Sequence, residues 1–220
     1  MDGLLLEDPY TEANNRLLAP FGKVYTWDIK QRIMGRKETD AAIYFLDYYK
    51  IPMTPQEYIK ERKCILEGLY SDCKPLPGVV RLVTHLKENG IPICIATSST
   101  RAAYILKSSK NKHLFDLFGD NVICSDDCNI ANGKPHPDLF LAAARSFGLN
   151  VSVETNNLNC LVFEDSPLGV EAGIRANMRV VWIPDACLTI DDELRGKVAK
   201  FLASMEDFDP PEFGLPPYQI

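Results

Sequence analysis

The amino-acid sequence predicts an α/β protein with a Rossmann-like, doubly wound parallel sheet and an inserted helical-bundle cap. Four short apolar runs are rich in Val, Ile and Cys and do not alternate with polar residues, which is typical of strands buried on both faces of a parallel sheet. Helical periodicity fills the intervals between these runs, and alternating β and α elements indicate this fold class. The runs are Ile91–Thr97, Val122–Ser125, Leu158–Phe163 and Arg179–Ile183.

Three amphipathic segments next to these runs predict helices. Apolar residues recur in each at three- or four-residue spacing, and a glycine follows the first two directly, as is common after a helix. The expected helices are Val79–Asn89, Asp138–Phe147 and Asp191–Ser204, and the apolar face of the first is expected to carry Val80, Val83 and Leu86.

Residues 10–75 show helical patterning without a strong strand and are interrupted by prolines and glycines. This stretch is expected to form a separate helical cap, with hinges at residues 7–9 and 74–78. The predicted division is therefore an α/β core of residues 1–9 and 76–206, a cap of residues 10–75, and a tail of residues 207–220. The tail contains four prolines and no periodicity, so we expect it to be extended.

The composition excludes several classes of protein. A hydrophobic content of 46% and a charged content of 25% are typical of a globular protein with a core. The net charge of −6 argues against nucleic-acid binding, yet a few local cations could still bind a small phosphorylated metabolite. Seven cysteines, an odd number, predict a reducing compartment, and we expect a cytoplasmic monomer. No apolar run is long enough to span a membrane, and no basic region marks a signal peptide.

Polar residues at the ends of two predicted strands could bind a phosphoryl group and a metal. Thr97 ends one strand, and its hydroxyl with the backbone N–H of Ser98 could hold a phosphate before a helix; alternatively, Thr97 caps that helix. Glu164 and Asp165 end another strand. Adjacent carboxylates repel unless a cation offsets their charge, and Mg²⁺ prefers oxygen ligands. The alternative is an acidic cluster that caps a helix.

Charged residues in loops and in the insert complete the candidate site. Lys134 lies in a Gly-Lys-Pro-x-Pro-Asp segment whose prolines stiffen the loop, so its ammonium could be fixed toward a phosphoryl group instead of being solvated. Arg36 and Lys37 follow a glycine in the insert and could equally be an exposed basic pair. Asp2 precedes Gly3. Taken alone, it could equally be an acidic residue in a disordered N-terminus.

Together, four segments resemble the motifs of the haloacid-dehalogenase-type (HAD) phosphatases, in the family's order. The four segments are Asp2-Gly3, Ala96-Thr97-Ser98-Ser99, Gly133-Lys134-Pro135-His136-Pro137-Asp138 and Phe163-Glu164-Asp165-Ser166-Pro167-Leu168-Gly169. The helical insert resembles the family's small cap class. The pseudouridine-5′-phosphatase branch, which neighbours glycerol-phosphate and deoxysugar-phosphate phosphatases and β-phosphoglucomutase, is most similar in three segments: Met34-Gly35-Arg36-Lys37, Ala96–Ser99 and Gly133–Asp138.

The resemblance implies Mg²⁺-dependent hydrolysis of a small phosphomonoester through an aspartyl-phosphate intermediate. The substrate would be a sugar phosphate, a polyol phosphate or a nucleoside 5′-monophosphate such as pseudouridine 5′-phosphate. The resemblance also implies a role for each candidate residue. Asp2 would be the general acid/base, and its backbone carbonyl would bind Mg²⁺ together with Glu164 and Asp165. Thr97, Ser98 and Lys134 would bind the phosphate, and Arg36 and Lys37 would contact the rest of the substrate from the cap.

The match to the first motif, Asp-x-Asp-Gly, begins at x, which is Met1. The nucleophilic Asp and the central strand that carries it would come before this residue. We therefore expect the sheet to lack its central strand and the 220-residue chain to be inactive. Two alternatives stay open: a phosphosugar mutase similar to β-phosphoglucomutase, and a non-catalytic product that binds phosphate or a partner.

Overall fold

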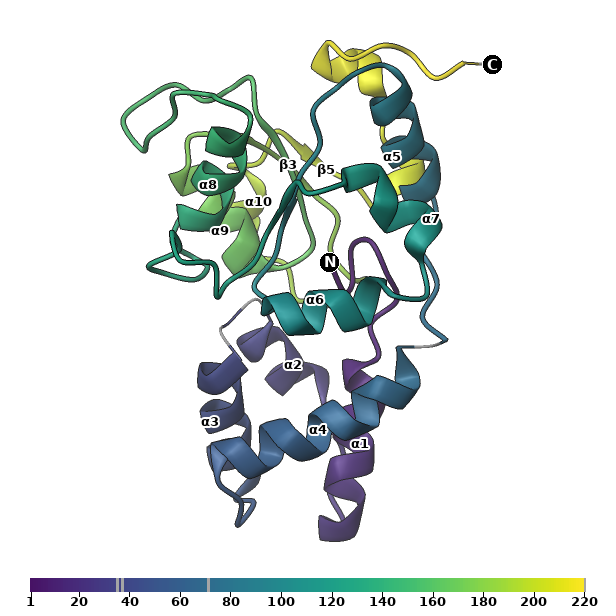
Figure 1. Cartoon of the computed structure of the whole chain (residues 1–220). Helices are drawn as coiled ribbons and strands as arrows, with labels where there is room; N and C mark the ends of the chain where they lie inside the picture. Colours follow the sequence, from purple (N-terminus) through teal and green to yellow (C-terminus); the bar gives the residue numbers. More distant parts are fainter. Residues whose placement is uncertain (35, 37, 71, 220) are drawn as a thin grey trace.

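The computed structural model describes residues 1–34, 36, 38–70 and 72–219. Short parallel strands lie among helices at one end of the molecule, and a group of helices lies at the other (Figure 1). This arrangement confirms the predicted α/β fold with a helical cap. In one sheet β1 (Ile95–Ala96) pairs with β2 (Val122–Ile123); in the other β3 (Leu161–Glu164) pairs with β4 (Arg179–Trp182), and β4 with β5 (Lys200–Phe201).

The two sheets are separate within the described residues, because no strand there pairs with both β1 and β3. This agrees with the expected lack of a central strand. The first six residues turn back on themselves, with the N–H of Leu6 donating to the Met1 carbonyl at 3.0 Å. Leu6 is fully buried in the same apolar cluster as Ile95 and Val181, so this turn packs between residues of both sheets.

Each of the four predicted strand runs coincides with a shorter strand, although β3 extends one residue beyond its run, to Glu164. The prediction for residues 191–204 was wrong. There α10 (Asp192–Arg195) ends before Gly196, and Lys200–Phe201 forms β5. The edge of β4 explains the difference, since its carbonyls need partners. The N–H groups of Ala199 and Leu202 donate to the Val180 and Trp182 carbonyls at 2.9 and 3.0 Å.

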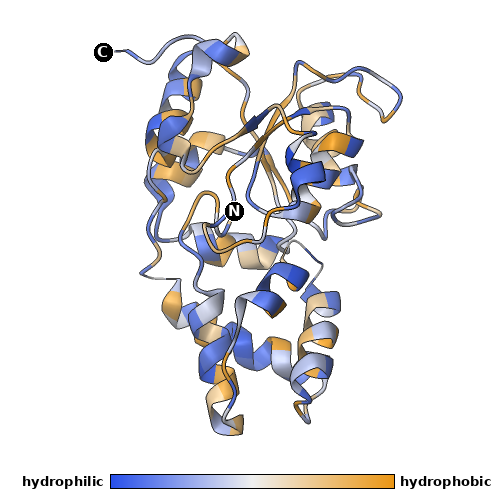
Figure 2. Ribbon diagram, turned by 180° about the vertical axis from the view of Figure 1, so that it is seen from behind, coloured by the Kyte–Doolittle hydropathy of each residue, from blue (hydrophilic) through white to orange (hydrophobic). Residues whose placement is uncertain are grey.

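Helices cover the strands. They are α5 (Val79–Glu88), α6 (Arg101–Ser108), α7 (Lys112–Phe115), α8 (Asp138–Ser146) and α9 (Pro167–Arg175). Two of them, α5 and α8, were predicted with nearly these bounds. Helix α8 contacts β1 and β2, whereas α9 contacts β3 and β4. The predicted face of α5 needs one correction: Val80 is exposed, and Val79 and Leu82 are buried instead with Val83 and Leu86. Figure 2 shows hydrophobic residues concentrated along the strands and the inner helix faces.

Residues 10–70 contribute no strand where they are described, and they build four helices. These helices pack around an aromatic cluster in which the Phe45 and Tyr58 rings stack with centroids 4.6 Å apart. The two chain crossings to the strands lie side by side, since Glu7 N–H donates to the Lys74 carbonyl at 3.0 Å. The boundaries predicted for core and cap stay a prediction. The helices are α1 (Tyr10–Leu18), α2 (Trp27–Ile33), α3 (Glu38–Tyr49) and α4 (Pro55–Leu69).

The C-terminal residues are packed, not simply extended as predicted. Residues 210–213 form a 3₁₀ turn, and the rings of Phe208 and Phe213 stack with centroids 5.2 Å apart. Further on, the Pro216 carbonyl lies 2.8 Å from His85 Nε2 on α5. Other 3₁₀ turns are Ala19–Phe21, Asp116–Phe118 and Met205–Asp207.

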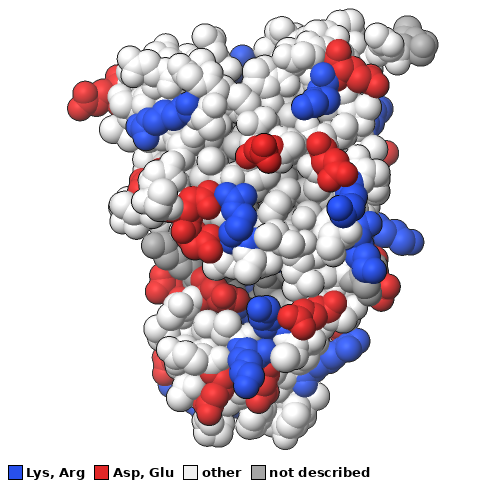
Figure 3. Space-filling model, in the orientation of Figure 1, with Lys and Arg blue, Asp and Glu red and all other residues white. Residues whose placement is uncertain are grey.

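All seven cysteines are unpaired. Among the described helices, none combines the length and the apolar character needed to cross a bilayer. Positive and negative side chains are interspersed on the face shown in Figure 3, with no separation of the two signs.

Candidate active site

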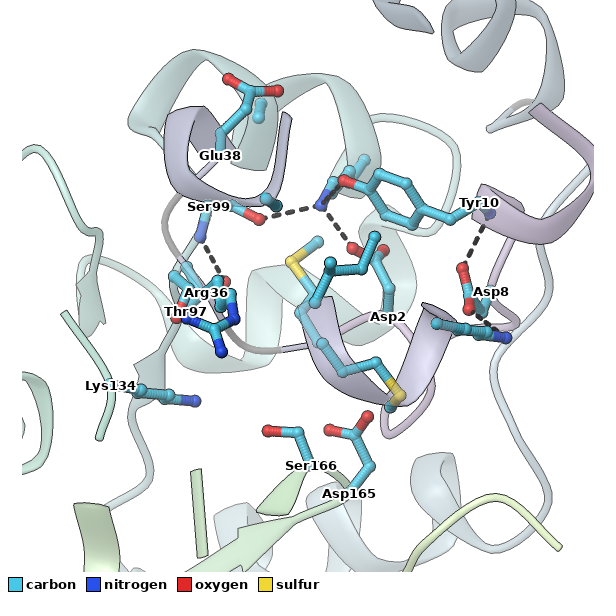
Figure 4. Close-up of a pocket in the computed structure, with 18 of the residues that line it drawn as sticks. Asp2, Asp8, Tyr10, Arg36, Glu38, Thr97, Ser99, Lys134, Asp165 and Ser166 are labelled. Atoms are coloured by element: carbon cyan, nitrogen blue, oxygen red, sulfur yellow. Dashed lines mark hydrogen bonds and ion pairs between the residues drawn. The ribbon is translucent and has the colours of Figure 1, made fainter. Parts of the chain in front are cut away.

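A cavity of about 190 Å³ lies between the strand ends and the cap helices, and every segment of the resemblance reaches it. Thr97 follows β1, and Asp165 follows β3, so both lie at the carboxyl ends of parallel strands, where ligands bind in this type of sheet. Asp2 and Lys134 join them from loops. Figure 4 shows these side chains pointing toward one space, with Asp8, Tyr10 and Glu38 on the cap side.

Asp2 is held by a lysine that sequence reasoning missed. The ammonium of Lys107 on α6 forms an ion pair with Asp2 Oδ2 and also donates to Ser99 Oγ at 2.8 Å and Tyr10 Oη at 3.1 Å. The Lys107 side chain is 2% exposed. Burial alone would lower the pKa of Lys107, but the carboxylate of Asp2 raises it. Lysine is rarely buried unless paired, and a lysine within a helical pattern gives no signal of such pairing in the sequence.

The other oxygen of Asp2 is available for chemistry. Asp2 Oδ1 is buried and has no hydrogen-bond partner among the described residues. A buried carboxylate oxygen without a donor is costly unless a ligand supplies one. This atom is therefore suited to exchange a proton with a group bound in the cavity.

Lys134 and Glu164 form a buried ion pair at the end of β3, with side chains 7% and 5% exposed. Glu164 Oε2 accepts from the Ser166 hydroxyl at 3.2 Å and from the Asp165 and Ser166 backbone N–H groups. Burial opposes ionisation, but the Lys134 ammonium holds the pKa of Glu164 below its usual value. Gly169 makes this packing possible, because a Cβ there would collide with the Glu164 carboxylate. The Lys134 ammonium is therefore buried and fixed by its ion pair with Glu164, which excludes the alternative of a solvated lysine.

Asp165 lies against the backbone of the first turn. A Cβ on Gly3 would come within 2.9 Å of Asp165 Oδ2, so only a glycine lets the chain pass this carboxylate so closely. Burial, and then the charge of Glu164, raises the pKa of Asp165 to about 7. A buried carboxylate beside a second one is stabilised by a cation. With the nearby backbone of residues 2–3, Asp165 offers the oxygen ligands that Mg²⁺ prefers, so these residues fit the metal.

Thr97 and Ser98 line the cavity after β1. Thr97 is 4% exposed, and its Oγ1 accepts from the Ser99 backbone N–H at 3.1 Å. Helix α6 is capped by Thr100, whose hydroxyl accepts from the Ala103 N–H at 3.3 Å, which excludes the alternative that Thr97 is this cap. Likewise Ser166 caps α9, so Glu164 and Asp165 are not its N-cap.

The cap side of the cavity differs from the sequence prediction. Arg36 lines the cavity, but it is exposed, and its Nε donates to the Arg32 carbonyl at 2.7 Å. Lys37 lies outside the described residues. Two cations that the sequence did not reveal line this wall: Lys30, paired with Asp8 at 2.7 Å, and Arg62, paired with Glu38 at 3.0 Å.

Comparison with known proteins agrees with this geometry. The family model for haloacid dehalogenase-like hydrolases matches residues 1–177. A probable pseudouridine-5′-phosphatase of Drosophila melanogaster is 41% identical over 99% of this chain and 93% of its own length. The (DL)-glycerol-3-phosphatase 2 of Arabidopsis thaliana is 39% identical over 100% of this chain and 90% of its own length.

Solved structures share the fold. A putative β-phosphoglucomutase from Thermotoga maritima is 25% identical, with a TM-score of 0.70 over 94% of this chain and 93% of that one. A HAD family hydrolase from Deinococcus radiodurans R1, solved with phosphate and sodium, has a TM-score of 0.74 at 22% identity over 99% of this chain and 95% of that one.

The fold and the site therefore define an enzyme of the hydrolase class. The chain belongs to the haloacid dehalogenase-like hydrolases, and the relatives that it matches over nearly their whole length are named phosphatases. The predicted family and enzyme class are confirmed.

Proposed function

We propose that this protein is a Mg²⁺-dependent phosphatase that acts as a monomer on a small phosphomonoester through an aspartyl-phosphate intermediate. One observation carries the proposal: all four motif segments and the cap helices border the same cavity. Thr97, Lys134, Asp165 and Asp2 come from distant parts of the sequence, and buried polar groups that converge on one cavity are typical of a ligand-binding site.

The polar groups of the core divide the work of phosphoryl transfer. Thr97, with the backbone of Ser98, binds the phosphoryl oxygens, and the Lys134 ammonium stabilises the charge that develops on them. Asp2 acts as general acid when the phosphorus–oxygen bond breaks, giving its proton to the leaving oxygen. It then takes a proton from the water that hydrolyses the aspartyl-phosphate. Lys107 keeps Asp2 in place during both steps.

Asp165 and the backbone carbonyl of Asp2 are the proposed Mg²⁺ ligands. Bound there, the ion would neutralise phosphoryl charge and orient the substrate. Glu164 accepts from Lys134 with one oxygen and from Ser166 with the other. We therefore assign Glu164 first to positioning Lys134, and its predicted role as a metal ligand requires it to give up one of these partners.

Among the described residues, no carboxylate that lines the cavity is left free to act as the nucleophile in this proposal. Five carboxylates line the cavity among the described residues, and each already serves another purpose. Asp8 and Glu38 pair with cations of the cap, and Glu164 pairs with Lys134. Asp165 is the proposed metal ligand, and Asp2 is the proposed acid/base. We propose that the 220-residue polypeptide binds phosphate and Mg²⁺ without turnover.

The relatives narrow the substrate to a phosphorylated metabolite of modest size, because their names specify pseudouridine 5′-phosphate and glycerol 3-phosphate. A cavity of about 190 Å³ is smaller than the ~300–1,000 Å³ typical of drug-sized ligands, which favours a polyol or single sugar as the leaving group. The structural neighbour named β-phosphoglucomutase supports a mutase as second candidate.

The test compares the 220-residue polypeptide with a form that carries an apolar strand ending in Asp directly before Met1. Release of phosphate and formation of sugar-phosphate isomers are measured over a panel of phosphomonoesters, with Mg²⁺ and with a chelator. We expect Mg²⁺-dependent phosphate release by the extended form only, roughly 10⁴-fold or more above the short form. The Asp2→Asn variant of the extended form should be inactive.

Three outcomes would contradict the proposal in different ways. Equal turnover by the short form would show that another residue attacks the phosphorus. Isomer formation without phosphate release would show a mutase. Undiminished turnover in the presence of the chelator would remove the metal from the mechanism.

A further inference from the structure

The cap wall of the cavity contains two polar side chains that have no role in the proposed hydrolysis of the phosphoryl group. Asn14 on α1 and Arg62 on α4 both line the cavity, and they are 1% and 4% exposed. Each has one donor nitrogen without a partner among the described residues: Asn14 Nδ2 and Arg62 Nε. Buried donors without acceptors cost free energy, so a pair of them beside a ligand cavity indicates a ligand that brings the acceptors.

Tyr58 fixes the orientation of both side chains. Its hydroxyl donates to Asn14 Oδ1 at 2.8 Å and accepts from Arg62 Nη1 at 3.1 Å. Burial raises the pKa of Tyr58 to about 12, so the hydroxyl keeps its proton at neutral pH and must donate it. Its acceptor is the Asn14 oxygen, which leaves the amide N–H₂ of Asn14 as the group without a partner.

The two buried cations of this wall, Arg62 and Lys30, are already paired with carboxylates, which restricts the chemistry of a ligand that binds beside them. Arg62 Nη2 donates to Glu38 at 3.0 Å, and the Lys30 ammonium lies 2.7 Å from Asp8. A second anionic group beside Arg62 or Lys30 would therefore meet a cation whose charge is already compensated, whereas Arg36 is exposed and donates to a backbone carbonyl. The unused donors suit neutral oxygens, either hydroxyls or carbonyls.

We propose that Asn14 and Arg62 form a subsite that binds neutral oxygen acceptors on the leaving group of the phosphomonoester. The assignment rests on the proposed phosphatase function, and it deepens that function by naming what the cap recognises. A polyol or sugar supplies the acceptors as hydroxyls, and a nucleobase supplies them as carbonyls. An alkyl phosphate lacks them and leaves both donors unsatisfied in the complex.

Binding of phosphonates tests the subsite without relying on turnover, because the carbon–phosphorus bond is not hydrolysed. Calorimetry with Mg²⁺ on the 220-residue chain compares 3,4-dihydroxybutylphosphonate with butylphosphonate, and methylphosphonate measures the phosphoryl site alone. A third ligand, the methylenephosphonate analogue of uridine 5′-monophosphate, separates base carbonyls from polyol hydroxyls. We expect the wild type to bind an oxygen-bearing ligand ~10- to 100-fold more tightly than butylphosphonate.

Two variants remove the donors, and each keeps one neighbouring contact. Asn14→Asp keeps the oxygen that accepts from Tyr58 and replaces the N–H₂ by an acceptor, and Arg62→Lys keeps a cation for Glu38 and removes Nε. Both should abolish the preference for the oxygen-bearing ligand and leave methylphosphonate affinity unchanged. Asn15→Asp is the matched control, since Asn15 Oδ1 accepts from the Tyr25 N–H at 2.8 Å, and this residue is outside the cavity lining.

The results separate failure of the subsite from failure of the proposed function. If methylphosphonate does not bind the wild type with Mg²⁺, the phosphatase assignment fails and the subsite with it. If methylphosphonate binds but neither oxygen-bearing ligand is preferred, or the preference survives in both variants, the subsite is wrong and the phosphatase proposal stands. Circular dichroism of the variants checks that lost preference does not reflect unfolding.

Discussion

Buried charges at the candidate site occur in pairs that join distant segments. Lys107 pairs with Asp2, Lys134 with Glu164, and Arg62 with Glu38. Pairing is required because an isolated charge in a protein interior loses its hydration without compensation. Among the described residues no cation forms an ion pair with Asp165, and this is the physical reason for placing Mg²⁺ beside it.

At the residue scale, we predict that Asp165→Asn weakens Mg²⁺ binding at least about tenfold. Removing a residue that only orients a metal ligand already lowers metal affinity by about this factor, and a direct ligand should matter at least as much. The measurement is calorimetric titration of Mg²⁺ in the presence of phosphate. The control is Asp127→Asn in a second acidic group, where the Asp127 carboxylate, close to Cys124 and Asp126, already pairs with Arg101 at 2.7 Å. If the Asp127 variant lost Mg²⁺ binding and the Asp165 variant kept it, the metal site would be at Cys124, Asp126 and Asp127 instead.

At the scale of elements, strand ends and the helices that follow them create the site. Helix α9 approaches β3 and β4 so closely that a Cβ on Gly173 would lie 2.7 Å from Val180 Cγ2. This close packing directs the N-terminus of α9 toward Glu164 and Asp165. The β-branched Val180 has little freedom to move away, because its side chain is restricted to few rotamers.

We therefore predict that Gly173→Ala destabilises the protein by about 1–2 kcal/mol, the usual effect of an overpacked core after allowing for the better helix propensity of alanine. Gly68→Ala in α4 is the control, because a Cβ there meets no atom within 4 Å. That control should stabilise the protein by about 0.4–1 kcal/mol. Chemical denaturation measures both. Equal effects of the two substitutions would show that α9 does not pack tightly on the strands.

For the whole molecule, the reactivity of the cysteine thiols measures how completely the core and the cap are folded. Cys64, Cys128 and Cys187 are exposed. Burial raises the pKa of the thiols at 73, 94 and 124 to about 11, so they carry little thiolate at pH values where exposed thiols react. The same burial keeps reagents away from them.

We predict that a thiol reagent at mildly alkaline pH modifies the three exposed cysteines quickly and reaches all seven only after denaturation. Absorbance of the released chromophore counts the thiols, and Cys187→Ser should lower the fast count by one. A fast count of six or seven would show that the core opens readily. A count below seven after denaturation under non-reducing conditions would reveal disulfides that the structure does not contain.

The resemblance of the motifs to the HAD family could be recognised without coordinates, because each motif is continuous in the sequence. Thr97, Lys134, Glu164 and Asp165 follow directly from local patterns of strand ends, prolines and adjacent acids. Elements that depend on distant partners were harder to predict. Strand β5 exists because β4 offers an open edge, and a 3.6-residue pattern at 191–204 cannot reveal that edge.

The sequence by itself determined the family and the fold class, and it predicted the groups that we propose to hold a phosphoryl group and a metal. Only the tertiary structure decided how these groups are partnered: that Lys107 holds Asp2, that Glu164 holds Lys134, and that Asn14 and Arg62 line the cap wall of the cavity. The reason is physical. A motif is a local pattern, whereas a buried charge or donor is stabilised by whichever distant residue the fold brings within hydrogen-bond reach.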